Sequence, residues 1–194
     1  MRSELTLGGW LAGAVILHLA AASLVPRIDL PDLVQFYGVI VVYAVPAGLG
    51  LWRAGWLKPW EAVVFALLVV AAHAIAVVAA IATMPTVGLT AAKVMQGGAL
   101  GGLLGAGLSL FGLAALREGW PRPIAFALAA AFTVVLALCG LLLVPALDAP
   151  ALPKELALPL ILYLPWQIVF SVAVGLVARP SRSGARLSTA PATP

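Results

Sequence analysis

Two histidines lie well inside long apolar stretches of this sequence, where few other side chains can take part in chemistry. His18 and His73 are flanked by Ala, Leu, Ile and Val residues, and the single cysteine, Cys139, lies in a third apolar stretch. Ionisable groups are costly to place in such surroundings, so these positions are candidates for function. Two histidines can ligate a b-type haem, share a metal ion or pass protons. If each is instead a neutral imidazole that only packs, no cofactor is needed. We expect none, and keep haem b or a metal ion at His18 and His73 as the alternative.

Polar side chains near the ends of two other apolar stretches could border a path for a small solute. Lys93 and Gln96 begin one stretch, where the lysine could meet an anionic headgroup, a solute or a loop carboxylate. Tyr163, Trp166 and Gln167 surround a proline, where a distorted helix could expose backbone carbonyls to a cavity. The ordinary alternatives are a lysine that extends to the headgroups and aromatic residues at the membrane interface.

The residue spacing of a known enzyme active site is absent from the sequence. The carboxylates fall outside the apolar stretches and both histidines fall inside them, so no Ser/His/Asp group is indicated. The motifs H-E-x-x-H and C-x-x-C are absent, and the glycines of residues 97–105 lie within an apolar stretch instead of a phosphate-binding loop. The sequence therefore predicts a protein that is not an enzyme.

The composition is that of a membrane protein. Of the 194 residues, 63% are hydrophobic and 9% are charged, whereas soluble domains carry about a quarter charged residues. The net charge of +4 does not indicate binding to nucleic acid, because the basic residues stand in short segments between apolar stretches. Membrane lipids are therefore the expected surroundings.

Six apolar stretches are long enough to cross a membrane as helices, since a hydrocarbon core of about 30 Å needs about 20 residues. The predicted spans are residues 7–25, 33–51, 62–82, 94–116, 124–144 and 156–177. The first resembles a cleaved signal peptide, but its length favours a retained span. Pro46, Pro159 and Pro165 are expected to kink their helices, and the last two should make the outer half of the sixth span the least regular part.

Two rows of small residues run along the fourth span. The members of each row recur every four residues: Gly97, Gly101, Gly105 and Ser109 in one, and Gly98, Gly102 and Ala106 in the other. Residues at this spacing share a helix face, so the rows predict a groove where another helix backbone comes close. We expect this helix to be central, and a side chain at Gly101 to have no room.

The basic residues predict the orientation in the membrane, because cytoplasmic segments are enriched in Lys and Arg. With a cytoplasmic N-terminus, eight lie inside: Arg2, Arg53, Lys58, Arg117, Arg122, Arg179, Arg182 and Arg186. Three lie outside: Arg27, Lys93 and Lys154. We therefore expect both termini to be cytoplasmic, in a bacterial-type inner membrane. Residues 181–194 are rich in Ser, Ala, Pro and Arg and are expected to form a disordered cytoplasmic tail.

Two loop motifs occur twice. The pattern R-x-G-W-x-[K/R]-P spans residues 53–59 and 117–123, and L-V-P-x-x-D-x-P-x-L spans residues 24–33 and 143–152. Repetition at this distance predicts three helical hairpins in parallel orientation, at about residues 1–60, 61–123 and 124–180, derived from one unit. The alternative is that short interfacial loops commonly contain Pro, Gly, Trp and Arg.

Together these patterns predict an all-α, polytopic membrane protein: a six-helix transmembrane bundle over residues 1–180. On one interpretation it is a non-enzymatic accessory or assembly subunit, or a homo-oligomer, whose glycine rows pack against helices of other subunits or of a second copy. On another it is a channel or transporter for a small, weakly polar solute that passes His18, His73, Lys93 and Trp166. Few charged residues lie within the spans, which weighs against ion-coupled transport and favours the first interpretation.

Overall fold

The computed structural model describes residues 2–28, 31–84, 88–116, 122–149 and 151–179. The predicted disordered tail, residues 181–194, lies outside the described residues. Within them the structure is helical and contains no strand. The first four long helices are α1 (Arg2–Leu24), α2 (Asp32–Arg53), α3 (Pro59–Thr83) and α4 (Ala91–Leu116), and a short 3₁₀ turn, η1 (Val25–Arg27), follows α1.

Two further spans are each built from several helical segments. The fifth consists of α5 (Arg122–Cys139), η2 (Gly140–Leu142) and α6 (Leu143–Leu147). The sixth consists of α7 (Lys154–Ala157), η3 (Leu158–Tyr163) and α8 (Leu164–Val177). The six stretches predicted from apolar runs coincide with these six helical units, because a long apolar run has no stable alternative to a helix in lipid.

The helices have the length and composition that a membrane requires. Five described helices contain an apolar window long enough to cross a bilayer, and the described part of α2, Tyr37–Arg53, is a shorter apolar helix. Large apolar side chains cover the outside of the bundle; Leu67 and Val78 of α3 are 65% and 64% exposed. A soluble domain rarely presents so much continuous apolar surface, so the fold is consistent with a membrane location.

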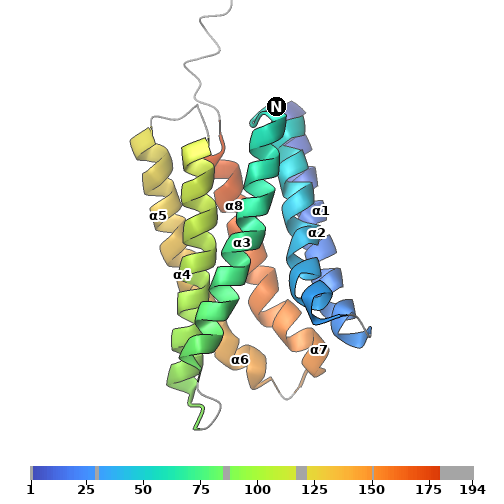
Figure 1. Cartoon of the computed structure of the whole chain (residues 1–194), viewed down its shortest axis with the longest axis vertical. Coiled ribbons are helices and arrows are strands. Elements are labelled where there is room, and N and C mark those ends of the chain that lie inside the picture. Colours follow the sequence, from blue (N-terminus) through green and yellow to red (C-terminus); the bar gives the residue numbers. More distant parts are fainter. Residues whose placement is uncertain (1, 29–30, 85–87, 117–121, 150, 180–194) are drawn as a thin grey trace, which may run out of the picture.

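The helices form a closed arrangement in which consecutive units are neighbours. Helix α1 packs on α2, α2 on α3, α3 on α4 and α4 on α5, and α8 contacts both α5 and α1. Figure 1 shows α1 and α2 on one side, α4 and α5 on the other, and α8 behind α3. Helix α4 also contacts α6 and α8, so it has more helix neighbours than the outer helices.

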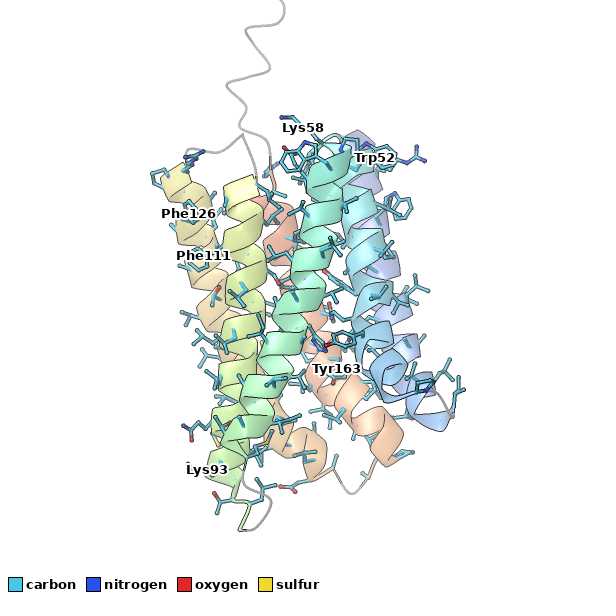
Figure 2. All side chains as sticks on the ribbon, in the orientation of Figure 1. Trp52, Lys58, Lys93, Phe111, Phe126 and Tyr163 are labelled. Atoms are coloured by element: carbon cyan, nitrogen blue, oxygen red, sulfur yellow. The ribbon has the colours of Figure 1, made fainter. Side chains whose placement is uncertain are left out.

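The two ends of the bundle differ in charge. Arg53, Lys58, Arg122 and Arg179 lie at one end with the N-terminus, and we call this the basic end (Figures 1 and 2). Lys93 lies at the far end, which we call the opposite end (Figure 2). Successive connections alternate between the two ends because each helical unit carries the chain across the bundle once.

The turn between α2 and α3 explains one of the repeated loop motifs. Gly55 has φ +72°, a left-handed conformation that glycine adopts without steric cost. Its amide donates to the Trp52 carbonyl at 2.8 Å, and the Trp56 amide donates to the Leu51 carbonyl at 2.9 Å. These bonds satisfy carbonyls at the end of α2 in the manner of a glycine C-cap. The second copy of the motif, around Gly119, lies outside the described residues.

The prolines have different effects in different helices. Pro159 lies in η3, which is a π-helix, and Pro165 lies in the first turn of α8. The predicted irregularity in the outer half of the sixth span is therefore confirmed. Pro46 lies inside α2, and the helix continues on both sides of it. The 3₁₀ segment η2 at Gly140–Leu142 breaks the fifth span at a position that contains no proline and was not predicted.

Candidate solute-binding cavity

A cavity of about 420 Å³ lies inside the half of the bundle near the opposite end. Its walls come from α1, α2, α3, α4, η2, α6, η3 and α8. Along α4 the lining extends from Gly97 to Ser109, a length of about 18 Å at 1.5 Å per residue. This volume falls within the range of small-molecule sites in proteins, about 300–1,000 Å³.

The cavity wall is mostly apolar and uncharged. Besides Tyr163 with its hydroxyl group, the described lining residues include five whose side chains contain a polar atom: His18, His73, Ser109, Trp166 and Gln167. Among the described residues that line the cavity there is no Asp, Glu, Lys or Arg. Such a wall suits an uncharged solute, because an ion would lose its hydration without gaining a counter-charge.

The glycine rows of α4 are occupied by helices of this same chain. A Cβ atom built on Gly97 would lie 3.0 Å from the Ala80 carbonyl oxygen of α3, and one on Gly105 would lie 3.3 Å from Ala76 Cβ. In the second row, a Cβ on Gly98 would overlap the Gly140 carbonyl oxygen of η2. One row therefore packs on α3 and the other on the fifth span, which holds α4 between them.

The tightest positions lie on the second of the two predicted rows, and the expectation that a side chain at Gly101 has no room is wrong. A Cβ on Gly101 would lie 3.4 Å from Ala80 Cβ, an ordinary van der Waals separation, so a small side chain has room there. A Cβ on Gly102, by contrast, would overlap the Leu136 carbonyl oxygen of α5. Gly140, which the sequence reading did not single out, packs backbone to backbone against Gly98. The close approach therefore lies on the Gly98 row.

His18 is held in the cavity wall by a backbone hydrogen bond. Its Nδ1 lies 2.9 Å from the Val39 carbonyl oxygen of α2. A carbonyl can only accept, so Nδ1 carries the proton and the neutral ring presents Nε2 as an acceptor. The side chain is 1% exposed, and Nε2 has no hydrogen-bond partner. An unpaired buried acceptor costs about 1–3 kcal/mol, which a bound group can recover.

Gln167 is a second polar group in this wall with an unpaired acceptor. The side chain is 2% exposed, and its Oε1 has no hydrogen-bond partner. Gln167 belongs to α8 and precedes Phe170 by about one helical turn. The Phe170 ring stacks on the Trp166 ring, with ring centroids 4.9 Å apart. The π-helix η3 immediately before α8 brings Tyr163 edge-on to His18, with ring centroids 5.4 Å apart. The cluster suggested around Pro165 thus meets His18 at one cavity, and Tyr163 is labelled in Figure 2.

His73 lines the same cavity from α3. The same cavity is therefore lined by His18, His73, Trp166 and Gln167, although these residues come from three different helices. Lys93 and Gln96 are placed elsewhere. Both are exposed near the opposite end, where Lys93 Nζ donates to Gln96 Oε1 at 3.4 Å, and neither lines the cavity.

Large buried side chains pack between the cavity and the basic end. The lining residues nearest that end are Val69, Ser109 and Phe170. Beyond them the large, fully buried side chains include Leu51, Phe65, Leu110, Leu113, Val174 and Val177, which we call the plug. The Tyr43 hydroxyl and Ser171 Oγ lie 3.0 Å apart and hydrogen-bond α2 to α8 beside it.

A second hollow, of about 590 Å³, lies between α1 and α8 toward the basic end, and Leu11, Ser171 and Arg179 are among its lining residues. None of the plug residues lines the cavity or this second hollow.

Tyr43 is a buried polar residue that sequence reasoning missed. The signal was present, because a tyrosine in the middle of an apolar span needs a partner for its hydroxyl. Its partner, Ser171, is 128 residues away and could not be inferred without the fold.

The described residues offer few ligands for a metal. No group of three or more His, Cys, Asp or Glu side chains comes together within them. His18 and His73 are the imidazoles at the cavity, and Nε2 of His18 is the nitrogen left without a partner. The lining holds no Arg or Lys that could pair with the propionates of a haem.

Comparison with known proteins adds no relative: no protein family, no curated protein and no solved structure matches this chain.

Proposed function

We propose that this protein is a membrane carrier for a small, weakly polar solute, held in a conformation in which its cavity is closed toward the basic end. The observation that carries the proposal is the 420 Å³ cavity, whose buried wall contains two acceptors without protein partners. Buried polar groups in native proteins almost always have partners. Two exceptions in one cavity wall favour a site that another molecule completes.

The plug favours a carrier over a channel. An open channel needs a continuous path, whereas the interior near the basic end is filled by Leu51, Phe65 and Leu113, all fully buried. A carrier exposes its site to one side at a time and needs such a closed half in each conformation. The α2–α8 hydrogen bond between Tyr43 and Ser171 belongs to that closed half.

Binding is tested with a pair of variants on adjacent residues of α3. Val77 lines the cavity, whereas Val78 is 64% exposed on the outside of the bundle. Equilibrium dialysis of the full chain in lipid nanodiscs, against 4-propylphenol and with empty nanodiscs subtracted, measures saturable binding. We expect Val77→Phe to fill the cavity and lower the affinity at least tenfold, and Val78→Phe to match the wild type. Equal binding by both variants, or no saturable binding by the wild type, would contradict the proposal.

We also propose that the protein spans a bacterial-type inner membrane with both termini in the cytoplasm. The bias of Lys and Arg toward the basic end supports this orientation. In a Cys139→Ala background, an impermeant thiol reagent applied to intact cells should label Asp29→Cys but not Arg182→Cys. The reverse pattern would overturn the orientation.

The three hairpins are proposed to share one origin. Helices α1 and α2, α3 and α4, and the fifth and sixth spans follow one another around the bundle in the same sense, which supports a parallel repeat. An experimental structure provides the test. If the third hairpin superposes on the first only after inversion in the membrane plane, the repeat is refuted.

A second candidate function is that of an accessory subunit or homo-oligomer, and one observation favours it. At Gly8, Gly9 and Gly13 of α1, a built Cβ would have no atom of another described residue within 4 Å, so the described residues leave this small-residue surface uncovered. Such faces allow close helix contacts in membranes. Native mass spectrometry of wild type and Gly9→Leu tests it: a defined complex that the substitution dissociates supports association, and a monomer in both opposes it.

Haem b at His18 and His73 is the remaining alternative. Purified protein that shows a Soret absorbance band, lost in His18→Leu, would replace the carrier proposal with a haem protein.

A further inference from the structure

The two unpaired atoms in the cavity wall are both hydrogen-bond acceptors, and this defines the class of solute. His18 Nε2 is an acceptor because the Val39 carbonyl holds the proton on Nδ1, at 2.9 Å. Gln167 Oε1, on α8, is the other acceptor. No described residue supplies either atom with a donor, so a molecule that pairs with one of them must bring its own.

The rest of the wall restricts the solute further. Most of the described lining residues are glycines or have aliphatic or aromatic side chains, and none of those described is Asp, Glu, Lys or Arg. An uncharged molecule with an apolar body therefore fits, because a charged one would find no counter-charge. The rings of Tyr163 and Trp166 also line the cavity and provide flat apolar surface beside the two acceptors.

We propose that the cavity selects neutral, largely apolar molecules that carry an O–H or N–H donor, with phenols and alcohols as the chemical class, and that the donor bonds to one of the two acceptors, His18 Nε2 or Gln167 Oε1. This inference rests on the proposed carrier function. It adds selectivity: an analogue without the donor leaves that acceptor unpaired, and such mismatches are penalised more strongly than changes in apolar size.

The test compares two probes that differ in the donor. 4-Propylphenol has an O–H group, and 4-propylanisole replaces it with a methyl ether. Equilibrium dialysis of the full chain in nanodiscs, with empty nanodiscs subtracted, gives the affinity of each. We expect the wild type to bind the phenol about tenfold more tightly than the ether, the effect of one net hydrogen bond.

Variants then assign the donor's partners. His18→Leu and Gln167→Met each remove one acceptor, and the variant that removes the acceptor bound by the phenol should reduce the phenol-to-ether ratio severalfold. Leu162→Met changes an apolar part of the same wall and serves as the control, because it should leave the ratio unchanged even if both affinities move. If His18→Leu does not fold, Gln167→Met, which keeps the side-chain length, still gives the comparison.

The outcomes separate this inference from the proposed function. Equal affinity of the wild type for both probes would overturn donor selection and leave the binding cavity in place. A ratio that persists in both His18→Leu and Gln167→Met would also overturn the assignment. If neither probe binds saturably, the proposed function itself fails.

Discussion

At the scale of single residues, the close approach of Gly98 and Gly140 fixes where α4 crosses the fifth span. The two backbones meet with no side chain between them, and Gly140 lies in the 3₁₀ segment that interrupts the span. Glycine at both positions removes the Cβ atoms that would hold the helices apart. On the other row, Gly101 has ordinary van der Waals space.

This difference predicts that replacing glycine by alanine affects the stability of the protein at one position and not at the other. Gly98→Ala should destabilise the protein by about 1–3 kcal/mol, because the added methyl would overlap the Gly140 carbonyl and force the helices apart. Gly101→Ala should change the stability little, since its nearest neighbour would be Ala80 Cβ at 3.4 Å. Thermal unfolding in detergent compares the two. Equal melting temperatures would show that the helices do not meet at Gly98.

At the scale of helices, α2 and α8 are joined through a polar contact inside an apolar interior. The Tyr43 hydroxyl and Ser171 Oγ are 3.0 Å apart, and the Tyr43 ring also packs on Phe170 with centroids 5.8 Å apart. Because α8 also borders α1 and α5, this contact helps to fix the helix that closes the bundle.

The contact should be measurable as a coupling energy. Tyr43→Phe is expected to lower the free energy of unfolding by about 1 kcal/mol, because Ser171 then lacks its partner. Ser171→Ala should have a similar effect, and the double variant should cost less than the two single variants combined. Unfolding in detergent of the wild type, the two single variants and the double variant gives the coupling energy between the two hydroxyl groups. Strict additivity would show that the hydroxyl groups do not interact.

Helices were predictable from the sequence because each apolar run is long enough to specify a span by itself. The irregular sixth span followed from Pro159 and Pro165, whose rings cannot continue a regular helix. The break at Gly140–Leu142 was not predicted, although a local cause is present: Pro145 in α6 lacks the amide that would bond to the Leu141 carbonyl, and its ring crowds that carbonyl.

The site was only partly predictable. Polar residues within apolar runs drew attention to His18, His73, Trp166 and Gln167, but not to a shared cavity. That property depends on which helices are neighbours, and the contact of α8 with α1 has no signature in the local sequence. Lys93 lies one turn from Gly97 on the same row, yet it lies near the helix end and outside the cavity lining.

At the scale of the whole molecule, a layer of large buried side chains lies between the cavity and the basic end. The cavity lining ends at Val69, Ser109 and Phe170, and the fully buried Leu110 and Leu113 lie beyond it. A second hollow of about 590 Å³ lies between α1 and α8 toward the basic end, and its lining contains no plug residue. The proposed transport would therefore require the plug side chains to move.

Accessibility of introduced cysteines should reflect this asymmetry. In a Cys139→Ala background, Gly101→Cys should react with a soluble thiol reagent, because position 101 lines the cavity and tolerates a Cβ. Leu110→Cys, in the plug, should react at least tenfold more slowly in the same membranes, because Leu110 is fully buried. Similar rates would mean that the plug is open.

The uncharged cavity wall has an electrical consequence. Moving one elementary charge through 100 mV changes its energy by about 2.3 kcal/mol, but the described lining of the cavity contains no Asp, Glu, Lys or Arg. A conformational change that exposes these lining residues to the other side would therefore move little of their charge through the membrane field. The rate of Gly101→Cys modification in proteoliposomes should accordingly stay the same when a potassium gradient imposes a potential of either sign, and the proposed transport should proceed equally well in energised and de-energised membranes.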